Sequence, residues 1–274
     1  MKQRPSFPAR FDRAAVGSRV LAAATTAAAD KTRVQTQALV GARSAEAPRA
    51  MRAVSAPESG SVAARRKMVK QLAGQGVSDA GVLGAMGTIE RHRFVDTALR
   101  GQAYEDTSLP IGLGQTISKP GVVSRMLALL RNGREGRLGR VLEIGTGCGY
   151  QAAVLSLLAQ EVYTIERLRG LHDRARENLR ELRLANVHLL FGDGMAGFAK
   201  GAPYAGIIAA AGGEAVPPAW TEQLAVGGRI VAHVSGAAGA PGQQALVVID
   251  RTRHGLHQTV FEGVHFVPLK SGIA

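Results

Sequence analysis

The residues whose types and spacing best suggest chemistry lie at 141–150, where a short apolar strand carries a carboxylate and leads into a glycine-rich turn. Gly145, Gly147 and Gly149 let the backbone turn sharply and let a ligand approach it closely, because glycine has no Cβ atom. The third glycine comes one residue earlier than in the dinucleotide-binding pattern, which weakens that interpretation. Glu143 would repel a pyrophosphate but attract a ligand that carries an amino group and a sulfonium. The segment therefore favours S-adenosylmethionine as the cofactor.

Two further acids follow the next two predicted strands. Glu166 comes directly after strand 161–165, 19 residues beyond the second glycine of the turn. Open α/β nucleotide sites place the acid that binds the ribose hydroxyls at this spacing. Asp193 follows strand 187–191. Because ligands of open parallel sheets bind where the carboxyl ends of the strands meet, these acids and Glu143 are predicted to share one site. Any one of them alone would suit a solvated loop residue or a helix cap.

The composition limits the classes of protein to which the chain can belong. With 274 residues it can bury one full core, and a catalytic domain with an appendage is the expected organisation. A single cysteine excludes an internal disulfide and suits a reducing compartment, so we expect a cytoplasmic location. The seven histidines offer no metal-ligand spacing beyond a weak pair, His254 and His257, and no metal is expected. No apolar run is long enough to span a membrane.

Residues 1–61 differ from the rest of the chain. They are rich in Ala, Arg, Ser and Thr, and the first 60 contain 10 Lys and Arg against 4 Asp and Glu. Such a segment has too little apolar surface to offset its chain entropy, so we expect a disordered basic tail ahead of a domain over 62–274. An organelle transit peptide would look the same, as would a start codon assigned too far upstream, with Met51 or Met68 as the later start.

From residue 62 onward the pattern is that of a globular α/β protein. Helices are predicted over 63–73, from a Ser78 cap to Glu90, over 120–130, from the glycine turn to 159, and over 218–225. A further helix carries a stripe of core residues: Leu168, Leu171, Ala175, Leu179 and Leu182. Strands are predicted at 161–165, 187–191, 205–210, 228–234, 244–250 and 264–269, where Pro268 implies an edge or terminal position. This alternation predicts a mostly parallel sheet with helices on both faces.

Four segments carry a more specific pattern. They are Leu-Pro-Ile-Gly-Leu-Gly-Gln-Thr-Ile-Ser-Lys-Pro at 109–120, the glycine turn at 142–151, Gly-Asp-Gly at 192–194 and Val-His-Phe-Val-Pro-Leu at 264–269. In this order they resemble the protein-L-isoaspartate O-methyltransferase family, and the first segment discriminates, since many methyltransferases share the glycine turn. The resemblance implies a Rossmann-like class I methyltransferase fold that uses S-adenosylmethionine. It also implies methylation of the free α-carboxyl of L-isoaspartyl residues, and of the side-chain carboxyl of D-aspartyl residues, which begins the repair of damaged proteins through a succinimide.

The resemblance further implies which residues form the site. The cofactor would be held by acids and glycines at the strand ends: Glu143, Gly145, Gly147, Gly149, Glu166, Asp193 and Gly194. Within that set, Glu166 would hold the ribose and Asp193 would face the adenine. The peptide would be bound by Gly114, Ile117 and Val264, with Ser118 as the catalytic residue. From the residues alone, Ser118 is more simply explained as the N-cap of the helix that Pro120 opens.

Two departures from the family pattern leave alternatives open. Ala205 stands where family members commonly have Asp, and Gly121 where they usually have a larger residue. A degenerate module that binds the cofactor without turnover would show such changes. The net charge of +13 would also suit an RNA methyltransferase. Against this, the Asn/Asp-Pro-Pro-aromatic motif is missing after strand 205–210, and aromatic residues make up only 4% of the chain. We expect damaged proteins as partners, no specific nucleic acid, no membrane and a monomer.

Overall fold

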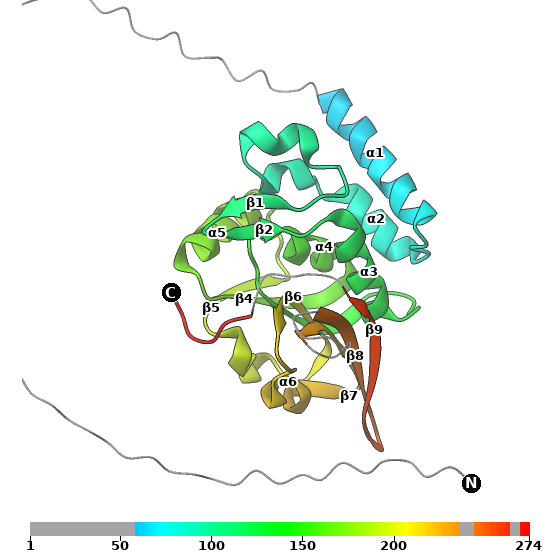
Figure 1. The fold of residues 1–274 in the computed structure, drawn as a ribbon, viewed down its shortest axis with the longest axis vertical. Helices are drawn as coiled ribbons and strands as arrows, with labels where there is room; N and C mark the ends of the chain where they lie inside the picture. The colour runs from blue at the N-terminus through cyan, green and yellow to red at the C-terminus, as the bar shows by residue number, and fades with distance from the viewer. Residues whose placement is uncertain (1–57, 236–243, 264–268) are drawn as a thin grey trace, which may run out of the picture. The chain divides into compact units, whose positions relative to one another are not determined.

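The computed structural model describes residues 58–235, 244–263 and 269–274. Their core is a seven-stranded sheet with the strand order β5-β4-β3-β6-β7-β8-β9, and a separate two-stranded sheet is formed by β1 and β2 (Figure 1). The strands are β1 Leu109–Gly112, β2 Gln115–Ile117, β3 Leu138–Ile144, β4 Ala159–Glu166, β5 Val187–Phe191, β6 Tyr204–Gly213, β7 Leu224–Ser235, β8 Gln244–Thr252 and β9 Gly255–Gly263.

The first five strands in this order, from β5 to β7, run parallel to one another, and the last two pairings, β7 with β8 and β8 with β9, are antiparallel. In the parallel part, Glu143 of β3 pairs with Thr164 of β4, and Glu166 of β4 pairs with Phe191 of β5. This register brings the carboxyl ends of β3, β4 and β5 to one edge, as the sequence predicts. β8 pairs antiparallel with both β7 and β9. The predicted α/β class with a mostly parallel sheet is therefore confirmed.

Helices cover both faces of this sheet. They are α1 Glu58–Gly74, α2 Ala80–Thr88, α3 Pro120–Arg131, α4 Tyr150–Leu158, α5 Arg169–Leu182 and α6 Pro218–Gln223, with short 3₁₀ helices η1 Arg91–Phe94, η2 Thr97–Gln102, η3 Gly194–Ala196 and η4 Ala199–Gly201. Adjacent strand residues belong to different cores: Val141 packs with α1 to α5, whereas Leu142 packs with Trp220 of α6. This period of two is expected for strands that are buried on both faces.

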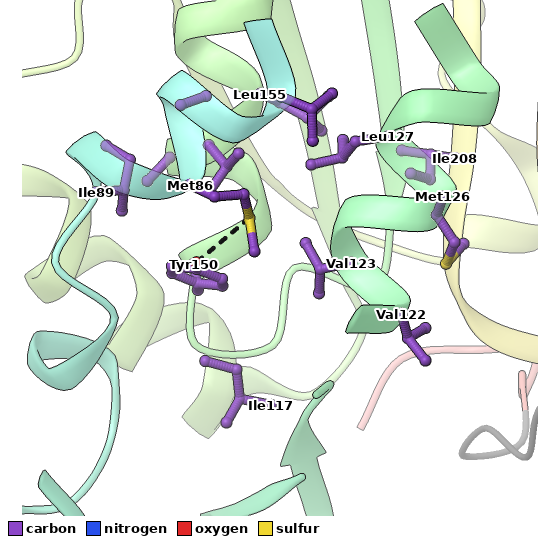
Figure 2. Close-up of a cluster of buried hydrophobic side chains, with 14 of the residues drawn as sticks. Met86, Ile89, Ile117, Val122, Val123, Met126, Leu127, Tyr150, Leu155 and Ile208 are labelled. Carbon is purple, nitrogen blue, oxygen red and sulfur yellow. Dashed lines mark hydrogen bonds between the residues drawn. The ribbon is translucent and has the colours of Figure 1, made fainter. Parts of the chain in front are cut away.

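The helices α2, α3 and α4 are joined by one apolar cluster (Figure 2). Met86 and Ile89 point into it from the α2 side, Val123 and Leu127 from α3, and Tyr150 from the start of α4. The Tyr150 hydroxyl donates to Met86 Sδ at 3.5 Å. The cluster fixes α3 relative to the glycine turn, which directly precedes Tyr150.

The structure corrects several local predictions. The cap of α2 is Asp79 and not Ser78, because the Asp79 carboxylate accepts a hydrogen bond from Val82 N. The helix that starts at Pro218 ends at Gln223, since β7 begins at Leu224. β9, the β1–β2 hairpin and the antiparallel pairing of β8 were not predicted, and α1 begins at Glu58, ahead of the predicted domain boundary. The strand predicted over 264–269, with Val264, falls almost entirely outside the described residues.

The leucine stripe of α5 lies in the core, as predicted. Leu171, Ala175 and Leu179 are buried, and Leu168 and Leu182 pack against them at the ends of the helix. No helix in the part of the chain that the structure describes is long and apolar enough to span a membrane.

Candidate functional site

A pocket of about 460 Å³ opens at the carboxyl ends of β3 and β4. One wall, which we call the strand wall, consists of 143–148, 150–151 and 165–168, and the opposite wall, the hairpin wall, consists of Ile111 and 113–118. Val123 of α3 and Leu269 also line it. A larger cavity of about 920 Å³ lies beside α2 and α3 but contains none of the predicted site residues.

The glycine turn forms the floor of the strand wall. Gly145, Gly147 and Gly149 have φ values of 88°, 58° and 90°, a region that favours glycine. Gly145 and Gly147 line the pocket. Gly149 does not, and a Cβ there would lie 3.1 Å from Leu179 Cγ, so this glycine allows close packing of the turn on α5.

Glu143 is fully buried beneath this turn. Its Oε2 accepts a hydrogen bond from Thr164 Oγ1 at 2.6 Å, while its Oε1 has no partner among the described residues. Burial, with a smaller contribution from the nearby Glu166, raises the pKa of Glu143 to about 8. The pocket therefore contains a carboxyl group with one oxygen left for a ligand.

Sequence reasoning missed Thr164 and Gln151, the two side chains next to the Glu143 carboxyl group. Thr164 has one hydroxyl hydrogen and gives it to Glu143, so Thr146, whose Oγ1 lies 2.6 Å from Thr164 Oγ1, is the donor in that pair. Gln151 faces Glu143 and lowers its pKa somewhat, although Gln151 Nε2 makes no hydrogen bond of normal geometry in the described part of the chain. The Thr164 contact depends on the register of β3 and β4, and the Gln151 contact depends on which face of α4 points to Glu143. Aligning the two predicted parallel strands could have placed Thr164 beside Glu143.

Glu166 is held rigidly at the end of β4. Its Oε2 accepts from Gly147 N, and its Oε1 accepts from Arg167 N and Leu168 N, all at 2.9 Å. The carboxylate is 5% exposed and lines the pocket. Because each carboxylate oxygen can accept two hydrogen bonds, Oε2 retains one free position. An acid in this state is oriented before any ligand binds.

Asp193 and Gly194 occupy different positions around the site. The Asp193 carboxylate accepts from Met195 N at 2.9 Å and from Gly272 N at 2.7 Å, and it does not line the pocket. Gly194 does line it, and a Cβ there would lie 2.5 Å from Ile144 Cγ2. Asp193 thus ties the 269–274 segment to the start of η3, and its predicted role toward an adenine stays a prediction.

The hairpin wall carries the predicted substrate residues Gly114, Ile117 and Ser118. Gly114 is exposed with a φ of 69°, and Ile117 is buried at the end of β2. Ser118 is half-buried, and its hydroxyl makes no hydrogen bond within the described residues. The N-cap of α3 is Lys119, with no side-chain cap, so the interpretation of Ser118 as a helix cap is wrong.

Comparisons with known proteins agree with this geometry. A model of the family described as Protein-L-isoaspartate(D-aspartate) O-methyltransferase (PCMT) matches residues 63–274. A protein-L-isoaspartate O-methyltransferase from Leptothrix cholodnii is 59% identical over 210 residues, which cover 76% of this chain and 74% of the relative.

Solved structures agree as well. One protein-L-isoaspartate O-methyltransferase structure superposes with a TM-score of 0.68 at 27% identity, over 76% of this chain and 67% of the other. A Plasmodium falciparum structure in complex with S-adenosyl-L-homocysteine shares the fold, with a TM-score of 0.65 at 21% identity over 75% and 98% of the two chains. The chain belongs to the protein-L-isoaspartate(D-aspartate) O-methyltransferase family.

Proposed function

We propose that Ser118, Glu143 and Glu166 divide the work of the reaction that this chain catalyses. The reaction transfers a methyl group from S-adenosylmethionine to the free α-carboxyl of L-isoaspartyl residues in damaged proteins. The side-chain carboxyl of D-aspartyl residues is the second substrate that we propose. One observation carries this division of roles: a single pocket has two buried, hydrogen-bonded acids on the strand wall and, on the hairpin wall, a Ser118 hydroxyl without a hydrogen bond among the described residues.

The residues present fit the cofactor. Glu143 Oε1 and Gln151 Nε2 are both buried without a partner among the described residues, one as an acceptor and the other as a donor. An amino acid moiety offers an ammonium group to the first and a carboxylate to the second. The free position on Glu166 Oε2 suits a ribose hydroxyl. Gly145, Gly147 and Gly194 let the ligand approach the backbone, Gly149 packs the turn, and Asp193 is proposed to lie near the adenine.

The reaction requires the protein to position the substrate carboxylate and the methyl group, and it requires no proton transfer. When bound, S-adenosylmethionine supplies a methyl group that the positive sulfonium makes electrophilic. A free α-carboxyl has an ordinary pKa of about 3.3–3.7, so at neutral pH it is already ionised and no general base is needed. Alignment of the reacting atoms accounts for about 7–11 kcal/mol of the barrier in favourable cases. Ser118 is proposed to donate its hydroxyl hydrogen to the substrate carboxylate and hold one oxygen in line with the methyl group.

The hairpin wall is proposed to receive the peptide. Gly114 has no side chain to block the approach of a substrate backbone, and Ile117 supports the wall from below. Val264 is assigned to the substrate from the family resemblance alone, since it lies outside the described residues. The methyl ester that forms then closes to a succinimide, whose hydrolysis returns some normal aspartate.

Three further assignments are proposals about the whole chain. We assign it to the cytoplasm, because its single cysteine is buried and needs no oxidising compartment. We assign it a monomeric state. The tail predicted over residues 1–61 overlaps the first turn of α1, so we propose that residues 1–57 are a basic tail outside the catalytic domain, as their composition indicates.

The comparisons do not favour the two alternatives. The chain is 59% identical to a relative named for isoaspartyl methylation, not for an RNA substrate. A degenerate module would keep the cofactor-binding acids and glycines of the strand wall, so turnover on an isoaspartyl peptide is the property that separates it from the proposed enzyme.

A direct experiment tests the proposed function. Purified protein is incubated with labelled S-adenosylmethionine and a pair of peptides that differ only in an aspartyl or isoaspartyl linkage. Label should appear on the isoaspartyl peptide alone. Cofactor binding without label on either peptide would instead identify a degenerate module. In a parallel reaction with RNA in place of the peptides, label on the RNA would identify the other alternative.

A further inference from the structure

The start of α3 is capped by a residue from a distant turn. Lys119 occupies the N-cap position without a side-chain cap. Asp106, which lies 15 residues before Gly121 in the chain, instead accepts a hydrogen bond from Gly121 N through Oδ1 at 2.7 Å. A carboxylate at a helix N-terminus satisfies an N–H group that has no partner within the helix, and the helix dipole favours its charge. Asp106 therefore fixes the beginning of α3.

The contact needs a residue without a side chain at position 121. A Cβ at position 121 would lie 3.0 Å from both Asp106 carboxylate oxygens. That distance is shorter than ordinary van der Waals contact, so a side chain here would displace the carboxylate. The glycine that departs from the family pattern thus has a physical reason in this chain.

The turn that carries Asp106 is itself held from the core. Arg91 of η1 is fully buried, and it donates from Nε to Ala103 O at 2.7 Å and from Nη2 to Thr107 O at 3.4 Å. The neighbouring His92 Nδ1 lies 2.7 Å from the Tyr104 hydroxyl. Arg91 Nη1 is buried without a partner among the described residues, so the bonds from Nε and Nη2 are the ones that tie both ends of the turn to η1.

Ser118 lies between two fixed points as a result. On its N-terminal side, Ile117 pairs with Leu109 at the base of the hairpin. On its C-terminal side, the Asp106 bond holds Gly121. The Ser118 hydroxyl, with no bond of its own in the described chain, depends on these backbone restraints for its direction.

We propose that Asp106 is a positioning residue for Ser118, because its bond to Gly121 N sets where the Ser118 hydroxyl meets the substrate carboxylate. This rests on the proposed function of Ser118. Asp106 itself does not line the pocket between the strand wall and the hairpin wall; it lines the larger cavity beside α2 and α3. Its effect should therefore appear in turnover of the peptide and not in cofactor affinity.

The test compares Asp106→Ala with Asp106→Asn. The alanine variant has no acceptor for Gly121 N, and kcat on the isoaspartyl peptide should fall by about tenfold or more, because a displacement on the order of 1 Å can cost about 100-fold. Its Kd for S-adenosylhomocysteine, measured by calorimetry, should stay within about twofold of the wild-type value. The asparagine variant keeps an acceptor oxygen and should recover most of kcat.

Two controls separate positioning from general loss of structure. Asp96→Ala removes a carboxylate that accepts from Ala98 N at the start of η2, a matched cap that is not connected to Ser118, and it should leave kcat unchanged. Gly121→Ala should lower kcat in the wild type but add little to Asp106→Ala, since the two changes break the same contact. Additive effects in this double-mutant cycle, or equal losses of kcat and cofactor affinity, would overturn the proposal.

Hydrogen exchange gives a readout that does not depend on activity. Amide exchange in the segment 117–123 should become faster in Asp106→Ala and stay slow in Asp106→Asn and Asp96→Ala. If the wild type methylates no isoaspartyl peptide, the proposed function fails. Unchanged exchange in Asp106→Ala overturns the positioning link, whether or not the wild type is active.

Discussion

The strand wall and the hairpin wall face the same pocket, yet they are fixed by different means. On the strand wall, Glu143 and Glu166 are buried and receive hydrogen bonds from Thr164 and from three backbone N–H groups. On the hairpin wall, the Ser118 side chain has no hydrogen-bond partner in the described chain, and Ser118 directly follows the short two-stranded sheet of β1 and β2. Changes to the strand wall should therefore act on binding, and changes to the hairpin wall should act on turnover.

Among the variants that test this difference between the two walls, Glu166→Ala is expected to have the largest effect. The variant should weaken cofactor binding by about 1.5–3 kcal/mol, the range for hydrogen bonds to a charged partner. Calorimetry measures the change, and Glu161→Ala is a matched control because Glu161 lies on the same strand, pairs with His188 and does not line the pocket. An unchanged Kd in a folded Glu166→Ala variant would remove the ribose assignment.

Ser118→Ala tests the other wall. It should lower kcat by at least about tenfold, which is ~1.4 kcal/mol of transition-state stabilisation, with little change in cofactor affinity. The free energy of unfolding should barely change, because the Ser118 hydroxyl caps no helix. Ser78→Ala is a suitable control, since Ser78 also precedes a helix whose cap is the next residue. Normal kcat in Ser118→Ala would refute the catalytic assignment.

The pH dependence of binding probes the strand wall alone. The pKa of Glu143 is raised to about 8 by burial, so below pH 8 the carboxyl is protonated in the free site. Binding an ammonium group to its carboxylate then releases a proton, and affinity should rise with pH by up to about tenfold per unit in this range. Well above pH 8 the ligand's own α-amino group loses its proton, and affinity should fall again.

Calorimetry with S-adenosylhomocysteine between about pH 6 and pH 9 measures this profile. In Glu143→Gln the amide cannot titrate, so the rise toward pH 8 should disappear. The same rise in wild type and variant would show that another group controls it. The same calorimetry on Ser118→Ala should give the wild-type dependence of Kd on pH, because the hairpin wall contributes no titrating group to cofactor binding.

The acids and glycines of the strand wall could be predicted from local patterns in the sequence. Gly114, Ile117 and Ser118 of the hairpin wall were named only through the family resemblance, and the β1–β2 hairpin that carries them was not predicted. Glu143, the glycines and Glu166 follow strands within a few residues, so a local pattern places them at one edge of a parallel sheet. Thr164 and Gln151 were missed because their roles depend on register and helix phase. The Asp106–Gly121 contact closes 15 residues of chain, and no local pattern encodes it.

Two smaller errors in the predicted elements also have identifiable physical causes. Ser78 and Asp79 are both good helix caps, and only the geometry decides between them. β9 follows a tight turn at Thr252–Gly255 that pairs it with β8, whereas the sequence offered only a weak histidine pair in this region. In both cases the residue types were suitable, but the choice depended on tertiary contacts.

The smallest effect is expected from a change that touches neither wall. Deletion of residues 1–57 leaves α1, which begins at Glu58, in place. Because the removed segment has little apolar surface to bury, Tm should change by less than about 2 °C, equivalent to less than ~1 kcal/mol for a domain of this size. Neither the Kd for S-adenosylhomocysteine nor kcat on a short, uncharged isoaspartyl peptide should change. A deletion that starts instead at residue 1 and ends at 74 removes α1 with its buried Met68 and Leu72 and should lower Tm clearly. If the shorter deletion lowers Tm as much as the longer one, residues 1–57 pack on the domain, and the proposed tail is part of the catalytic unit.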